Sequence, residues 1–283
     1  MVESTTIAQV SRGARIFITL AAVFVAAAGI SLYFLSTQTS TYFAWTIKPP
    51  ATAAFLGAGY LTVAVALLLA LREPLWANVR VGVWVVATGL IAILIASLLH
   101  IDKFHLDSAV PSAKGWAWSW MFLYIVLVPG LAVTLRAQSR TPGDDPPRTA
   151  PLPNSLRTIM RVLGAVMLVL GAILFAVPAS AELLWPWPLT PLTARMVGSF
   201  YMAIGMSLIV GARENDYVRI LVASAAYVIG VLLHATNLVR YPVVDWTDPA
   251  GVLYVAVLLA LFAIGIAGLR GFGASRRGST SAE

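Results

Sequence analysis

The sequence contains no cysteine and only three histidines among its 283 residues. Without cysteine there are no disulfides, thiolate metal sites, iron–sulfur clusters or cysteine nucleophiles. Charged residues are also scarce, at 11%, whereas soluble domains average about 25%. No nucleotide-binding, hydrolase or zinc-protease motif occurs, and no carboxylate lies near the middle of an apolar run. These absences argue against ATP-driven and hydrolytic functions and against a proton relay, and they favour a protein that is not an enzyme.

Apolar residues, by contrast, make up 59% of the chain. They fall into runs long enough to cross a bilayer, which takes about 20 residues of helix. Backbone groups in hydrocarbon must bond within their own segment, so each run is predicted to be a helix. The eight predicted spans are 16–35, 52–71, 81–99, 116–135, 160–178, 193–212, 217–234 and 251–269. The sequence therefore predicts an all-α, polytopic membrane protein.

The basic residues predict an orientation for these spans. Of the 19 lysines and arginines, the five that fall on the side opposite the N-terminus are Lys48, Lys103, Lys114, Arg195 and Arg240. The positive-inside rule then places both termini in the cytoplasm. Arginine and alanine usage indicates a bacterial chain, hence a bacterial inner (plasma) membrane protein. The net charge of +7 is explained by membrane lipid headgroups as partners, without nucleic acid.

An internal repeat divides the chain. Pro50–Glu73 aligns without a gap on Pro191–Glu214, with identical residues at 8 of 24 positions. This pattern predicts two tandem four-helix repeats that are parallel, related by an axis along the membrane normal. The predicted units are a first repeat over 1–136, a proline-rich cytoplasmic linker over 137–156, a second repeat over 157–272 and a disordered cytoplasmic tail over 273–283. The linker is expected to be extended and poorly packed.

The stretch LLWPWPLTPLTAR, residues 183–195, precedes the sixth span. Its counterpart, FAWTIKPPATAA, precedes the second span, so most of the tryptophan and proline cluster is predicted to be a duplicated helix start at the membrane interface. Arg195 has no counterpart and is costly near hydrocarbon unless it is paired. Its expected partners are Glu182, Asp245 or Asp248, or else an anionic ligand.

His100 and His234 end matching spans of the two repeats. If a pseudo-twofold axis brings them together, they are candidates to ligate haem or another metal, or to hydrogen-bond a quinone. The alternative is a polar residue that ends each helix and packs there. The plan of eight helices in two halves is similar to that of haem A synthase, but that family places histidines on several helices of each half, so its activity is not inferred.

A second metal candidate lies in the loop HIDKFHLD, where His100, Asp102 and His105 are mixed ligands suited to zinc or manganese. The alternative is a solvated loop. Charged residues repeated at the cytoplasmic helix ends, Glu73 and Glu214 among them, are predicted to form local salt bridges and to anchor the helices.

Tyr60 and Tyr201 occupy equivalent positions and are candidates to line a central cavity or to bond a neighbouring helix. The leading hypothesis is a ligand site between the repeats for haem, a quinone or a lipid. Its expected residues are His100, His234, Tyr60, Tyr201 and Arg195. The alternatives are a transporter or permease for a neutral or anionic small molecule, and an accessory subunit of a larger membrane complex.

Overall fold

The computed structural model describes residues 6–280, with side chains described as far as Arg277. The chain is helical, without a strand in that range. Its eight long helices are α1 (Arg12–Phe34), α3 (Pro50–Ala70), α4 (Trp76–Leu99), α5 (Pro111–Gln138), α6 (Asn154–Ala176), α8 (Pro191–Glu214), α9 (Leu221–Arg240) and α10 (Pro249–Thr280). All eight are long and apolar enough to cross a membrane. The predicted all-helical architecture with eight candidate spans is therefore confirmed.

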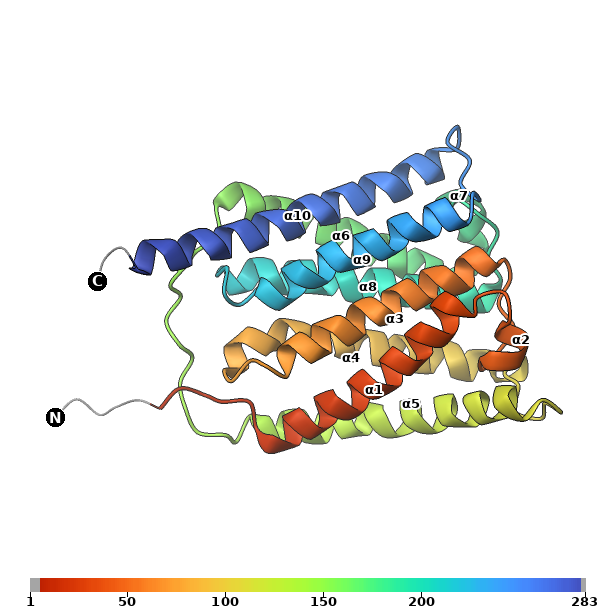
Figure 1. Ribbon diagram of the computed structural model, residues 1–283, viewed down its shortest axis with the longest axis horizontal. Coiled ribbons are helices and arrows are strands. Elements are labelled where there is room, and N and C mark those ends of the chain that lie inside the picture. The colour runs from red at the N-terminus through yellow and green to blue at the C-terminus, as the bar shows by residue number, and fades with distance from the viewer. Residues whose placement is uncertain (1–5, 281–283) are drawn as a thin grey trace.

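The long helices lie side by side in one bundle (Figure 1). Helix α1 begins and α10 ends at the same end of the bundle, which we call the terminal end. Two short helices, α2 (Thr39–Tyr42) and α7 (Ala181–Leu184), lie at the opposite end, which we call the α7 end.

Helices α3, α4, α8 and α9 form the centre of the bundle. Helix α8 packs along α6 on one side and along α4 on the other, while α3 lies between α1 and α9. Helix α8 is also the most buried of the spans, with 72% of its membrane window inside the protein. We call the part up to the end of α5 the first half and the part from α6 onward the second half. They meet mainly through α3 against α9 and α4 against α8.

Glycines allow the closest of these helix crossings. A Cβ atom on Gly198 of α8 would lie 2.6 Å from the carbonyl oxygen of Gly171 of α6. About two helical turns farther along α8, a Cβ on Gly205 would lie 2.7 Å from the carbonyl oxygen of Gly164 of α6. Small residues let backbones approach to this distance in membrane bundles.

The start of α8 differs in part from the prediction. Thr190 and Thr193 form a reciprocal capping box, and Pro191 occupies the first turn, as a proline at a helix start should. Trp185 and Trp187, predicted to lie at the membrane interface, are instead buried at 3% and 4% exposure. These rings do not reach water or lipid as the prediction implied, because the loop folds inward onto α3, where the Trp187 indole donates to Thr52 Oγ1 at 2.9 Å.

The two segments predicted to be irregular are more ordered than expected. Helix α5 extends to Gln138 and α6 begins at Asn154, so the linker is shorter than 137–156. The tail predicted to be disordered from residue 273 continues α10 as far as Thr280, and residues 281–283 lie outside the described part. Alanine and arginine in this tail are good helix formers, so the helix does not end at its glycines.

Candidate functional site

A narrow cavity of about 160 Å³ lies between the halves of the bundle. Its walls come mostly from the central helices α3, α4, α8 and α9, and they are almost entirely apolar. On α3 the lining residues run from Phe55 to Ala70, a length of about 22 Å at the helical rise per residue. Dry apolar cavities of about 150 Å³ bind a benzene-sized ring. The cavity volume matches that of one such ring but is spread along the helices, so the cavity suits a thin, elongated apolar group.

Toward the α7 end the cavity is lined by ring side chains that carry polar atoms, two tyrosine hydroxyls and one imidazole. Tyr201, His234 and Tyr254 all face it. The Tyr254 hydroxyl lies 3.5 Å from His234 Nδ1, at the long limit of a hydrogen bond. The Tyr201 hydroxyl makes no hydrogen bond with any described residue. An apolar cavity thus ends beside an unpaired hydroxyl and an imidazole.

These rings belong to a larger group that we call the aromatic cluster. Its members contact one another at ring centroid distances of 4.6 to 6.2 Å; they are Phe55, Trp185, Trp187, Tyr201, His234 and Tyr254. Trp185 Nε1 is buried without a hydrogen-bond partner among the described residues. Burying such a donor costs free energy. The cluster therefore contains an indole N–H without an acceptor, in a ring that contacts both Tyr201 and Tyr254.

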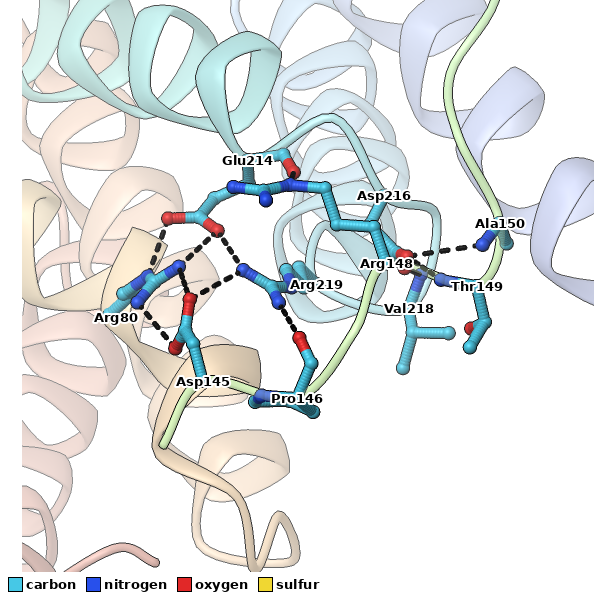
Figure 2. Close-up of polar contacts among 10 residues, drawn as sticks. All are labelled: Arg80, Asp145, Pro146, Arg148, Thr149, Ala150, Glu214, Asp216, Val218 and Arg219. Carbon is cyan, nitrogen blue, oxygen red and sulfur yellow. Dashed lines mark hydrogen bonds and ion pairs between the residues drawn. The ribbon is translucent and has the colours of Figure 1, made fainter. Parts of the chain in front are cut away.

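At the terminal end, the cavity reaches Arg219, which belongs to a network of four charged side chains (Figure 2). Glu214, at the end of α8, pairs with Arg80 of α4 and, at 2.8 Å, with Arg219. Asp145 of the linker pairs with the same two arginines, at 2.7 Å and 3.1 Å. Because Arg80 belongs to the first half and Glu214 to the second, the network joins the halves directly.

Asp145 is the most exposed member, with 43% of its side chain accessible. Partial burial acts to raise the pKa of Asp145, but hydrogen bonds and charge from Arg80 and then Arg219 outweigh it and hold the pKa below its usual value. A lowered carboxyl pKa stabilises the fold above about pH 4, and this contribution is lost as the pH falls further.

The linker expected to be poorly packed is held by hydrogen bonds at Thr149 and Ala150. Asp216, 2% exposed, accepts hydrogen bonds from the backbone nitrogens of Thr149 and Ala150, and its other oxygen accepts from Val218 (Figure 2). Ala150 in turn accepts a bond from the Tyr217 nitrogen. The linker is irregular and mostly exposed, as expected, but the buried Asp216 carboxylate satisfies two of its backbone donors and holds it against the second half.

Replacing Asp216 by alanine is expected to release this segment. The change leaves three backbone donors without their acceptor, a loss of about 2 kcal/mol, so local opening should rise about thirty-fold. Trypsin cleavage after Arg148, followed by mass spectrometry, measures the opening. Asp144→Ala is the matched control, because Asp144 bonds through its backbone. Equal cleavage rates in both variants would contradict this account.

The two equivalent tyrosines have different surroundings. Tyr60 shares a hydrogen bond of 2.8 Å with the Tyr124 hydroxyl and lines a smaller cavity of about 60 Å³, which shares wall residues such as Phe200 with the larger one. Tyr201 lines the larger cavity with its hydroxyl unpaired. Both tyrosines are therefore near cavities, as expected, but the structure does not bring them to one site.

The two histidines also lie in different surroundings. His100, just past the end of α4, accepts a hydrogen bond at Nε2 from Arg195 of α8 at 2.7 Å. His234 lies within α9 and stacks on Phe55 of α3 at 4.6 Å. Each histidine thus contacts the other half, but among the described contacts none joins the two imidazoles. A haem held by both side chains has no support in this geometry.

The residues of the proposed metal loop are engaged separately. Asp102 pairs with Lys103 at 2.8 Å, and His105 contacts Thr46 Oγ1 with one ring nitrogen and the carbonyl oxygen of Phe43 with the other. Within residues 6–280, no group of three or more potential ligands lies close enough to hold a metal. His100, Asp102 and His105 are therefore not gathered into a site.

Arg195 does not pair with any of the three acidic residues expected. Asp245 accepts from Thr247 and Asp248 from the Ala250 nitrogen, while Glu182 is exposed. The pairing prediction is wrong because the start of α8 packs against α4, which presents His100 rather than a carboxylate.

Several residues that matter here were not anticipated from the sequence. Tyr254 and Phe55 complete the aromatic cluster, and Asp145 completes the charge network. Nothing in a single sequence marks an apolar ring or a linker carboxylate as the partner of a distant helix.

No protein-family model, curated protein or solved structure matches the chain.

Proposed function

We propose that this protein binds an elongated, uncharged lipophilic molecule in the cavity between its halves. Its head, a ring bearing carbonyl oxygens as in a prenyl quinone, lies against the aromatic cluster, and its chain follows the cavity toward Arg219. The observation that carries this proposal is the unpaired Tyr201 hydroxyl at one end of a long cavity that is otherwise apolar.

The chemistry of the lining favours an uncharged head. Tyr201 and Tyr254 offer hydroxyl donors, and His234 offers a ring nitrogen, all suited to a carbonyl oxygen. The described residues lining the α7 end of the cavity include no lysine, arginine or carboxylate to compensate a charged head. The six rings of the aromatic cluster provide flat faces for stacking.

The wider setting is part of the same proposal. Paired contacts support two tandem repeats: α1 crosses α3 at Gly57 as α6 crosses α8 at Gly198, and α3 meets α9 as α8 meets α4. We place the protein in the bacterial plasma membrane, with the terminal end in the cytoplasm, because most basic residues lie at that end.

Filling the cavity tests the proposal. Ala223→Phe on α9 introduces a ring into the lining, whereas Ala225→Phe on the same helix lies outside it. Binding of a short-tailed prenyl naphthoquinone, followed by quenching of tryptophan fluorescence, should weaken about tenfold or more in the first variant and not in the second. Tyr201→Phe, which removes one hydrogen bond, should weaken binding about fivefold.

Two results would overturn the proposal. One is equal affinity for the quinone in the wild type and Ala223→Phe when both proteins have the same melting temperature. The other is the absence of quinone binding to the wild type while it transports a polar solute into liposomes, which would favour a permease.

A further inference from the structure

Arg195 is a cation near the α7 end of the bundle with no anionic partner. It lies in the second turn of α8 and is half-buried. Its Nη1 donates to His100 Nε2 at 2.7 Å, and its Nε is buried without a hydrogen-bond partner among the described residues. None of the ion pairs in the described part of the chain includes it. The guanidinium is therefore held in place by a neutral group and is not neutralised.

The His100 side chain does not supply a negative charge to neutralise Arg195. An imidazole nitrogen that accepts a hydrogen bond from a guanidinium is unprotonated. Burial, and then the positive charge of Arg195, lower the pKa of His100 below its ordinary value. The nearby carboxylate of Asp102 is exposed and paired with Lys103. The pair thus carries a net positive charge in a partly desolvated place, which is costly without an anion.

Exposed apolar side chains flank this pair. Leu98, Leu99 and Ile101, on both sides of His100 in the chain, are 49%, 59% and 46% exposed. On a membrane-spanning helix such side chains face lipid. A cation bonded to His100, whose chain neighbours expose apolar side chains, combines the two features that a phospholipid needs, a donor for its phosphate and an apolar surface for its acyl chains.

We propose that Arg195 and His100 bind the phosphate of an anionic phospholipid headgroup at the α7 end of the bundle. The Nη2 nitrogen, which has no hydrogen-bond partner among the described residues and is not buried, donates to the phosphate oxygens, and His100 orients the guanidinium through Nη1. Arginine suits this role because its planar donors match phosphate oxygens. The site lies outside the cavity lining, so it does not depend on the proposed function.

Native mass spectrometry of the full-length protein in detergent tests the site. The probes are phosphatidylglycerol, diacylglycerol with the same acyl chains, and inorganic phosphate. We expect the wild type to retain one phosphatidylglycerol molecule more strongly than any further phosphatidylglycerol that binds. It should not retain diacylglycerol. In Arg195→Gln that affinity should fall about tenfold, because a charge-assisted hydrogen bond is lost. Arg213→Gln, at the exposed far end of the same helix, should bind as the wild type does.

Arg195→Lys and the wild type keep the test decisive if Arg195→Gln does not fold. Lysine retains the charge but not the fork of donors, so its affinity should lie between those of the wild type and the glutamine variant. Equal retention of phosphatidylglycerol and diacylglycerol by the wild type would overturn the proposal. So would binding of inorganic phosphate by the wild type at least as tight as that of phosphatidylglycerol, since the lipid chains would then contribute nothing to the site.

Discussion

Replacing Glu214 by glutamine is expected to destabilise the folded protein by about 3 kcal/mol. Glu214 is 9% exposed and pairs with both Arg80 and Arg219, and Arg219 is only 2% exposed. Removing one partner of a buried ion pair leaves an uncompensated charge, which typically costs 3–5 kcal/mol. We expect the lower end of that range because Asp145, itself 43% exposed, still contacts both arginines.

The repeat supplies a matched control for this change. Glu73 occupies the equivalent position in the first half, at the same distance from the aligned prolines. In the structure its carboxylate accepts a hydrogen bond from the Asn78 side chain and forms none of the described ion pairs. Glu73→Gln should therefore cost less than about 1 kcal/mol.

Unfolding by denaturing detergent, followed by circular dichroism, measures both variants. A double-mutant cycle of Glu214→Gln with Arg80→Gln isolates the contact between the two halves. Because the pair is largely buried, salt should change the coupling energy little. Equal stability of Glu214→Gln and Glu73→Gln would mean that the network contributes nothing measurable to holding the halves together.

This contrast also shows what the sequence reveals and what it does not. The alignment marks Glu73 and Glu214 as equivalent, and both were predicted to form local salt bridges. Only Glu214 forms ion pairs, and they join the halves, because α8 ends near α4 and the linker passes over both. Residues at equivalent positions of the repeat make different contacts when the elements around them differ. The linker between the halves occurs once, so only Glu214 lies beside it.

The spans were predictable for a simple reason: crossing a bilayer requires a length of apolar helix that the chain itself displays. Side-chain partners across the halves follow instead from packing. Arg195 meets His100 and Phe55 meets His234 because α4 contacts α8 and α9 contacts α3. No local pattern encodes which helices are neighbours, so the sequence named the two histidines and Arg195 but joined them wrongly.

Glycine patterns lie between these cases, since the sequence shows where close crossings are possible but not how tight each is. Gly198→Ala is expected to cost about 3 kcal/mol or more. Its new methyl would lie 2.6 Å from the Gly171 carbonyl oxygen and 3.0 Å from the Phe175 nitrogen. Both atoms belong to the backbone of α6, so the two helices must separate along a buried contact to accommodate it.

Replacing two other helical glycines by alanine provides controls with smaller expected effects. A methyl on Gly211 would lie 3.0 Å from the terminal carbon of Met160, a flexible side chain that can move aside, so Gly211→Ala should cost about 1 kcal/mol. Gly115 has no atom within 4 Å, and Gly115→Ala should stabilise by up to about 1 kcal/mol through helix propensity. Unfolding free energies that follow this order attribute the effect to the α6–α8 crossing. If Gly198→Ala matched Gly115→Ala, the two helices would have to pack more loosely than this contact requires.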